Sequence, residues 1–299
     1  LPAGEPIHDM LLRLDGDVLT AANTGAQLDA AGVEGLSTLR ASAKRDDDPV
    51  ATVGRFGVGF AAVLAVTDEP AILSTAGGVR WSRSEVRAAA AGVPALEPEL
   101  ARRGDAVPVL RLPYPAQGEV PPPYDTVVVL RLRDDLARTA VADLLAGVGD
   151  AVLLALPGLT DLVVEVDGAH RAISARHVGD SVELDDDGVR TRWRLARRSG
   201  DLDPALLTDR PAEERTRPYW AVTVAVPIDA VGDPVALPAS VARVVHAPTP
   251  TDDQTALPVL VLATFPLDTT RRRVAPGPLT DSLVGEVGHA YAALARGFV

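Results

Sequence analysis

Hydrophobic and polar positions alternate over short stretches in the first part of the chain. Residues 11–22, LLRLDGDVLTAA, predict two strands joined at Asp15-Gly16-Asp17, because an Asp-Gly step between apolar runs favours a hairpin. Apolar residues then recur at helical spacing over 28–39. A second hairpin is predicted around Gly77-Gly78, and TVVVLRL at 126–132 is predicted to be a buried strand.

The rest of the chain also mixes helical and extended patterns. Residues 84–104 are predicted to be helical in part, and the Pro-rich stretch 108–123 is predicted to be loop or extended chain. Hairpins outnumber strict β-α-β alternation, which favours an α+β fold over a doubly wound parallel sheet. Two domains are expected, at 1–133 and 134–299. Further helices are predicted at 134–155 and 279–297, and further strands at 162–166, 189–196, 220–226 and 259–265.

Composition excludes several classes of function. The formal net charge of −12 repels nucleic-acid backbones and anionic lipids, so neither partner is expected. The absence of cysteine excludes disulfides, thiolate metal sites and cysteine nucleophiles. No run reaches the roughly 20 apolar residues of a membrane span, and the first ten residues lack a signal-peptide pattern. The five histidines, including His170 and His177, show no metal-ligand spacing.

The glycine-rich turn Gly54-Arg55-Phe56-Gly57-Val58-Gly59, followed by an apolar helical stretch from Phe60, is the most informative motif. Glycines let a backbone approach a ligand closely, and a helix amino terminus offers free N–H groups to phosphates. A tight packed turn is the other reading. A P-loop is excluded because Phe60 and Ala61 replace the required Lys and Ser or Thr. A dinucleotide fingerprint fails because a charged loop precedes the turn.

Several motifs in order resemble one family. Ser42-Ala43-Lys44-Arg45, the glycine turn and Val66-Thr67-Asp68-Glu69-Pro70 are similar to the sacsin-type nucleotide-binding domain of the GHKL ATPase superfamily. Asn23-Thr24-Gly25 stands where that family has its Asp-x-Gly adenine motif, and Tyr124-Asp125-Thr126 resembles its last motif. The resemblance covers 11–132 and extends more loosely to 257–273. It implies a two-layer α/β sandwich of the Bergerat type, followed by a second α/β coupling domain.

The resemblance also implies roles for particular residues. Gly54, Arg55, Phe56, Gly57, Val58 and Gly59 would wrap the phosphates of ATP, with Ser42 and Lys44 on a lid nearby, although Lys44 alone reads as a solvated loop lysine. Asn23, in place of the usual Asp, would face the adenine amine beside Gly25, and Thr126 would help hold the ring. Within Arg271-Arg272-Arg273, Arg272 would sense the phosphates; an exposed basic turn is the alternative.

The family's catalytic helix is missing before Asn23. That helix carries a Glu that activates water and an Asn that holds Mg²⁺, but Pro2 and Pro6 oppose a long helix here, and no Asn follows Glu5. No catalytic residue and no metal ligand are therefore assigned, and hydrolysis is expected to be weak or absent. A fragment of a longer ATPase is favoured; an undefined mobile segment and a natural non-hydrolysing homologue stay open.

Two functions from different classes follow. The first is an ATP-binding module of a chaperone-type ATPase, cytoplasmic, from a GC-rich bacterial gene, whose partners beyond ATP would be client proteins. The second is a scaffold or protein-interaction module that keeps the fold and binds no nucleotide. Oligomeric state is not indicated by the sequence.

Overall fold

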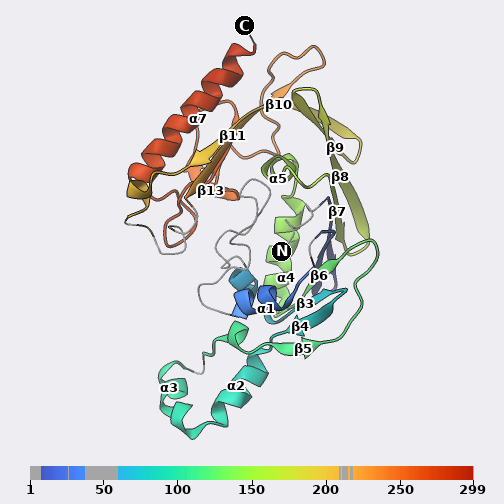
Figure 1. Ribbon diagram of the computed structural model, residues 1–299. Helices are drawn as coiled ribbons and strands as arrows, with labels where there is room; N and C mark the ends of the chain where they lie inside the picture. Colours follow the sequence, from blue (N-terminus) through green and yellow to red (C-terminus); the bar gives the residue numbers. More distant parts are fainter. Residues whose placement is uncertain are drawn as a thin grey trace. The chain divides into compact units, whose positions relative to one another are not determined.

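The computed structural model describes residues 8–25, 27–37, 60–104, 106–208, 210, 215 and 218–298 (Figure 1). These residues combine helices with fourteen strands, in agreement with the α+β class. The chain divides into two compact units, the first made of 1–146 and 162–171 and the second of 147–161 and 172–299. The sequence-based division after residue 133 instead assigned the following helix to the second domain.

The first unit is built on seven strands in the spatial order β7-β1-β2-β6-β3-β4-β5. The pairs β1–β2, β2–β6, β6–β3, β3–β4 and β4–β5 are all antiparallel. The strands are β1 (Asp9–Asp15), β2 (Val18–Asn23), β3 (Thr67–Ser74), β4 (Gly77–Arg80), β5 (Tyr114–Ala116), β6 (Thr126–Leu132) and β7 (Asp161–Val166).

Both predicted hairpins are present, and the turn residues of the first explain its position. Gly16 and Asp17 join β1 to β2, and Gly16 takes a φ of 55°, which a residue with a Cβ rarely adopts. The turn predicted at Gly77-Gly78 lies two residues earlier: Thr75 and Ala76 join β3 to β4, and the two glycines begin β4, opposite Ser74 and Leu73. The buried strand predicted at 126–132 coincides with β6.

The pairing register gives this group of strands two distinct faces. On one face, Leu11, Ala22, Val127 and Leu73 follow one another across four strands and pack with Val120 and Tyr124 of the preceding loop. The opposite face carries Val128, Ile72 and Val79, which form a second cluster with Trp81 and Val109. Helical segments contribute Val33, Leu36, Phe60 and Leu64 to that second cluster. The second cluster therefore lies between the strands and the helical segments.

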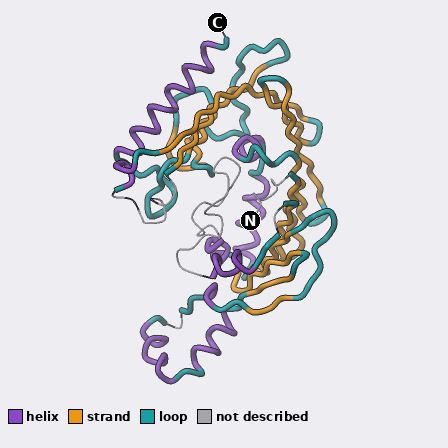
Figure 2. Tube along the Cα trace, viewed as in Figure 1, coloured by secondary structure: helices purple, strands orange, loops and turns teal. Residues whose placement is uncertain are grey.

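Some helices of the first unit begin at polar caps. Asp29 accepts the backbone N–H of Gly32 at 2.7 Å and caps α1, and the Ser82 hydroxyl accepts that of Glu85 and caps α2. Figure 2 shows α2 and α3 at one end of the strands of their own unit. The helical segments are α1 (Ala30–Ser37), η1 (Phe60–Ala65), α2 (Arg83–Ala91), η2 (Pro94–Leu96), α3 (Glu97–Arg102), η3 (Val109–Arg111) and α4 (Asp135–Ala146).

The second unit has a seven-strand order, β13-β12-β14-β11-β10-β9-β8, in which β12–β14 is a parallel pair. Helix α7 (Pro278–Arg296) packs on β10, β11 and β14 through Leu279, Leu283, Val287, Ala290 and Leu294. Its strands are β8 (Ala169–Val178, from Ala172 in this unit), β9 (Ser181–Asp186), β10 (Val189–Asp201), β11 (Tyr219–Ile228), β12 (Val244–His246), β13 (Pro250–Gln254) and β14 (Leu260–Ala263).

One predicted helix is two helices. The pattern over 134–155 predicted a single helix, but α4 ends at Ala146 and α5 (Asp150–Ala155) starts after Gly149, which is fully extended. Gly147 and Gly149 disfavour a continuous helix because glycine loses more backbone entropy there than other residues. The apolar stretch that follows the glycine turn is also shorter than an ordinary α-helix: it is the 3₁₀ segment η1.

Candidate functional site

Asn23, Thr126 and Ser74 form a polar row across three neighbouring strands. Asn23 ends β2 and lies opposite Thr126, the first residue of β6; Thr126 in turn lies opposite Ser74, the last residue of β3. Side chains alternate along a strand, so these three share the face of Val128 and Ile72, which carries the helical segments. The register thus brings together two of the residues that the sequence predicted to contact adenine.

Gly25 sets the direction of the backbone after the end of β2. Its φ of 115° is open to glycine and rarely to other residues. The Gly25 N–H donates to Oδ2 of Asp125 at 2.9 Å, and the Asp125 N–H donates to the carbonyl of Asn23 at 2.9 Å. Asp125 therefore holds the Asn23-Thr24-Gly25 segment against the start of β6, a role that motif comparison did not assign to it.

The side-chain amide of Asn23 is oriented by a local bond. Its Nδ2 donates to the carbonyl of Thr24 at 2.9 Å, and the residue is half-buried. With the nitrogen engaged, Oδ1 is the part of the amide that is suited to accept a hydrogen bond from an amine.

Ser74 was missed by sequence reasoning. It is 7% exposed, and its hydroxyl lies 3.1 Å from the carbonyl of Gly77 and 3.3 Å from that of Leu28. The second contact ties the end of β3 to the segment that leads into α1. A lone serine before a glycine turn gives no signal in the sequence; only the strand register identifies it.

Phe60, the first described residue after the glycine turn, packs on the same face as the polar row. Its ring lies 5.4 Å from that of Trp81, at an interplanar angle of 54°. Such a tilted pair is a favourable aromatic geometry. The indole nitrogen of Trp81 is buried without a hydrogen-bond partner in the described part of the chain.

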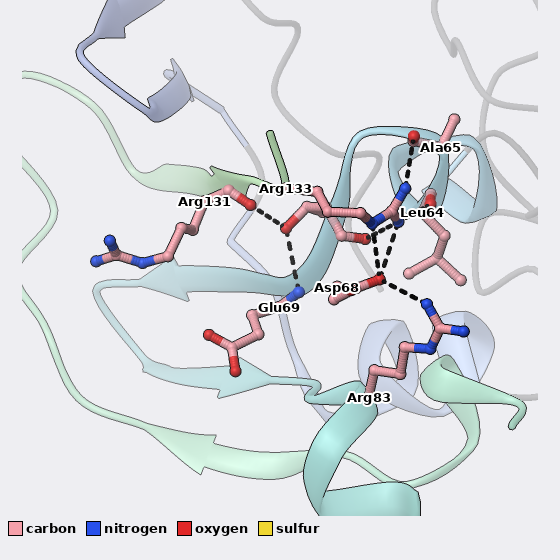
Figure 3. Close-up of polar contacts among 8 residues, drawn as sticks. Leu64, Ala65, Asp68, Glu69, Arg83, Arg131 and Arg133 are labelled. Atoms are coloured by element: carbon pink, nitrogen blue, oxygen red, sulfur yellow. Dashed lines mark hydrogen bonds and ion pairs between the residues drawn. The ribbon is translucent and has the colours of Figure 1, made fainter. Parts of the chain in front are cut away.

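Arg133 holds the carboxyl end of η1 (Figure 3). Its Nη2 donates to the carbonyl of Leu64 at 2.8 Å and to Oδ1 of Asp68 at 2.9 Å, and Nη1 donates to the carbonyl of Ala65 at 3.2 Å. Arg83, at the start of α2, reaches the same Asp68 oxygen at 3.5 Å. The hydrogen bond from Arg133 is the main cause of a lowered pKa at Asp68, partly opposed by burial of the carboxyl.

Tyr124 belongs to the opposite face. It packs with the cluster of Leu11, Ala22 and Val127, and burial raises the pKa of its phenol, aided by the carboxylates of Asp9 and Glu165. The three residues of the motif Tyr124-Asp125-Thr126 therefore have different positions. Tyr124 packs in the apolar cluster, Asp125 accepts from the N–H of Gly25, and Thr126 lies on the face with Asn23.

Arg272 lies in the second unit and is paired with a carboxylate there. Its Nε is 3.1 Å from Oδ2 of Asp252, and the side chain is 73% exposed. Asp268 shapes the turn before it by accepting from Thr270 Oγ1 at 2.8 Å. The exposed basic turn considered as the alternative fits these contacts. The other predicted ligands of the phosphates, Ser42, Lys44, Gly54, Arg55, Phe56, Gly57, Val58 and Gly59, lie outside the described residues.

Within the described ranges, no group of three or more His, Cys, Asp or Glu side chains is arranged to hold a metal ion. His170 is instead 3.5 Å from Oε1 of Glu165. None of the described helices is long and apolar enough to span a membrane. No protein-family model matches the sequence, and no curated protein matches it either.

Proposed function

We propose that the first unit is a nucleotide-binding module of the GHKL type, with the Bergerat-type two-layer α/β sandwich, and that it binds ATP with little or no hydrolysis. The observation that supports this most directly is the pairing of Asn23 with Thr126 beside a glycine of positive φ. Two strand ends thereby present an amide and a hydroxyl to the face that carries α1 and η1.

The chemistry of adenine fits these two groups. Its exocyclic amine is a donor, and Oδ1 of Asn23 is an acceptor; the Thr126 hydroxyl can donate or accept at the ring nitrogens. An amide lacks the charge of the family's aspartate, so weaker binding is expected than for an Asp at this position.

The phosphate end of the proposal rests on the sequence. The glycine turn 54–59 would supply backbone N–H groups, and η1, which follows it, packs on the same face as the polar row. Ser42 and Lys44 remain proposed contacts, and Mg²⁺ would bind through the phosphates, because no protein ligand for it is assigned.

Calorimetry with ATP and Mg²⁺ tests the proposal directly. Asn23 is also the only asparagine in the 299 residues, so ¹⁵N-asparagine labelling gives a single side-chain amide signal. We expect that signal to shift with ATP and ADP but not with inosine diphosphate, which has no exocyclic amine. Absence of heat and of any shift at millimolar nucleotide would favour the scaffold function instead.

Substitutions sharpen this test. Asn23→Asp is expected to tighten ATP binding about tenfold, because a charged acceptor strengthens the hydrogen bond by roughly 1–2 kcal/mol. Thr126→Val is expected to weaken it. Thr20→Val is the matched control, because Thr20 lies on β2 like Asn23 but on the opposite face of the strand. We expect the Thr20→Val variant to bind ATP with the affinity of the wild type.

A further inference from the structure

A cavity of about 630 Å³ lies within the second unit, on the strands β8, β9 and β10 and the segment that follows β11. Its floor is a ladder of charged side chains, in which Arg192 lies opposite Glu183, Glu183 opposite Arg176, and Arg190 opposite Asp185. The volume falls in the range of roughly 300–1,000 Å³ that is typical of small-molecule sites. The cavity shares no lining residue with the polar row of the first unit.

One hydrogen-bond donor of this floor, Nε of Arg192, has no hydrogen-bond partner among the described residues. Asp185 already accepts from Nε of Arg190 at 2.9 Å and from the N–H of Gly188 at 2.8 Å, and its pKa is lowered, mainly by Arg190. Nε of Arg192, in contrast, is 3.6 Å from Oε1 of Glu183 and is buried without a hydrogen-bond partner among the described residues. Because the Arg192 side chain as a whole is 34% exposed, an acceptor from outside the chain can reach its guanidinium.

One wall of the cavity is apolar and well ordered by local bonds. Ile228, Val235 and Ala236 line it. Oδ1 of Asp229 accepts the N–H groups of Val231, Gly232 and Asp233 at 2.9–3.0 Å, and the Val235 N–H donates to the carbonyl of Pro227 at 2.9 Å. This wall is therefore formed before any ligand binds, and Asp229, although it lines the cavity, is occupied by the turn.

We propose that this cavity binds a small organic monoanion with an apolar body, such as an aromatic carboxylate. Its carboxylate accepts from Arg192 and Arg176, and its ring lies against Ile228 and Val235. The lining carries three arginines, Arg176, Arg190 and Arg192, and three carboxylates, Glu183, Asp185 and Asp229, so the formal charges balance. A polyphosphate would therefore bring several negative charges without counter-charges, whereas a monoanion brings one, which the donors of Arg192 and Arg176 can receive.

The test is a calorimetric titration of the full chain with 2-naphthoate. A second titration uses the neutral isostere 2-naphthylmethanol. We expect saturable binding of the carboxylate and at least about tenfold weaker binding of the alcohol, because the charged hydrogen bonds are lost. Arg192→Gln and Arg176→Gln should each weaken naphthoate binding about five- to tenfold. Arg176 is exposed, so its variant is expected to fold even if the other does not.

Control variants show whether a loss of naphthoate binding comes from the cavity or from a general loss of folding or charge. Val235→Asp should abolish binding, whereas Val231→Asp, on the same turn but 83% exposed and outside the cavity, should not change it. Arg198→Gln is the control on β10, because Arg198 pairs with Glu286 of α7 at 2.7 Å. Absence of saturation at millimolar naphthoate, equal binding of the alcohol, or unchanged affinity in the lining variants would each overturn the proposal.

Discussion

Nε1 of Trp193 donates a 3.0 Å hydrogen bond to Oδ2 of Asp150, which ties β10 to the first turn of α5. Oγ1 of Thr191 donates to the same oxygen at 2.6 Å, and Asp150 is 7% exposed. Asp150→Ala would remove the acceptor that both donors share, and Nε1 of Trp193 would keep only its 3.0 Å contact with Oγ1 of Thr191. We expect it to lower the free energy of unfolding by about 2–4 kcal/mol, measured by tryptophan fluorescence in urea. Asp201→Ala, exposed at the end of β10, should change it by less than about 0.5 kcal/mol.

The contacts of Arg133 with Asp68 and η1 give a second prediction. Arg133→Met removes the donors to the carbonyls of Leu64 and Ala65, and we expect a loss of about 1 kcal/mol, limited by the partial exposure of the side chain. The pKa of Asp68 should rise toward its ordinary value, measured by carboxyl NMR titration. Arg131→Met is the control: Arg131 lies on β6, two residues before Arg133, and the side chains of its ion pair with Asp17 are 65% and 62% exposed. Equal losses in both variants would contradict the prediction.

His246 makes the stability of the second unit depend on pH. The side chain is 3% exposed, and burial lowers its pKa below 6.5, partly opposed by the carbonyl of Ala242. As the pH is lowered, the unfolded chain therefore takes up a proton on His246 near pH 6.5, before the folded chain does. The free energy of unfolding is retained above that pH and falls as the pH drops toward the pKa of the folded state. Urea unfolding at a series of pH values should show this decline, and His246→Gln should reduce it. His177→Gln, at an exposed position, should leave the decline unchanged.

Two glycines should respond to alanine in opposite directions. Gly285 lies within α7 with open space around its missing Cβ, so Gly285→Ala should stabilise the chain by about 0.5–1 kcal/mol. A Cβ on Gly78 would come within 2.5 Å of Leu73 Cδ2 and 2.9 Å of the Ala116 carbonyl, so Gly78→Ala should destabilise by about 1–3 kcal/mol. Thermal unfolding measures both, and a shift of the same sign in the two variants would refute this packing argument.

Hydrolysis and phosphate binding provide the last prediction. Phosphate release from ATP should be close to background, because no general base is assigned in the chain. Gly57→Ala should remove nucleotide binding, since the added methyl blocks close approach of the phosphates. A robust rate that a point mutation abolishes, or an unchanged affinity in Gly57→Ala, would show that the base or the phosphate site lies elsewhere.

Local patterns were enough to predict the strands that alternate or bury apolar residues. The hairpin at Gly16 and the strand β6 follow from turn residues and from a run of valine and leucine, whereas the turn of the second hairpin lies at residues 75–76, just before the predicted Gly77-Gly78. Strands β8 and β9 were not predicted, because they are held partly by cross-strand charges: Glu183 pairs with Arg192 and Asp185 with Arg190. Charged residues of this kind resemble a solvated loop when only the sequence is considered. The cross-strand partner that stabilises them in a strand lies on a different segment of the chain.

The candidate site was predictable only in part. Motif order predicted Asn23, Gly25 and Thr126 as nucleotide contacts, which stays a prediction. The face that Asn23 and Thr126 share depends on which residues pair across β2, β6 and β3. Ser74 and the turn-holding role of Asp125 depend on the same register, which no single segment contains. The second-unit cavity was beyond sequence reasoning as well, because its donors and its apolar wall come from four separate strands and a turn.

The division of the chain has a practical consequence for dissecting the protein. Because residues 147–161 belong to the second unit and 162–171 to the first, the polypeptide passes from one unit to the other three times. No single cleavage separates them, and a truncation after residue 133 would remove both α4 and β7, the strand beside β1. Isolating the first unit would therefore require a circular permutation or a designed bridge from residue 146 to residue 162.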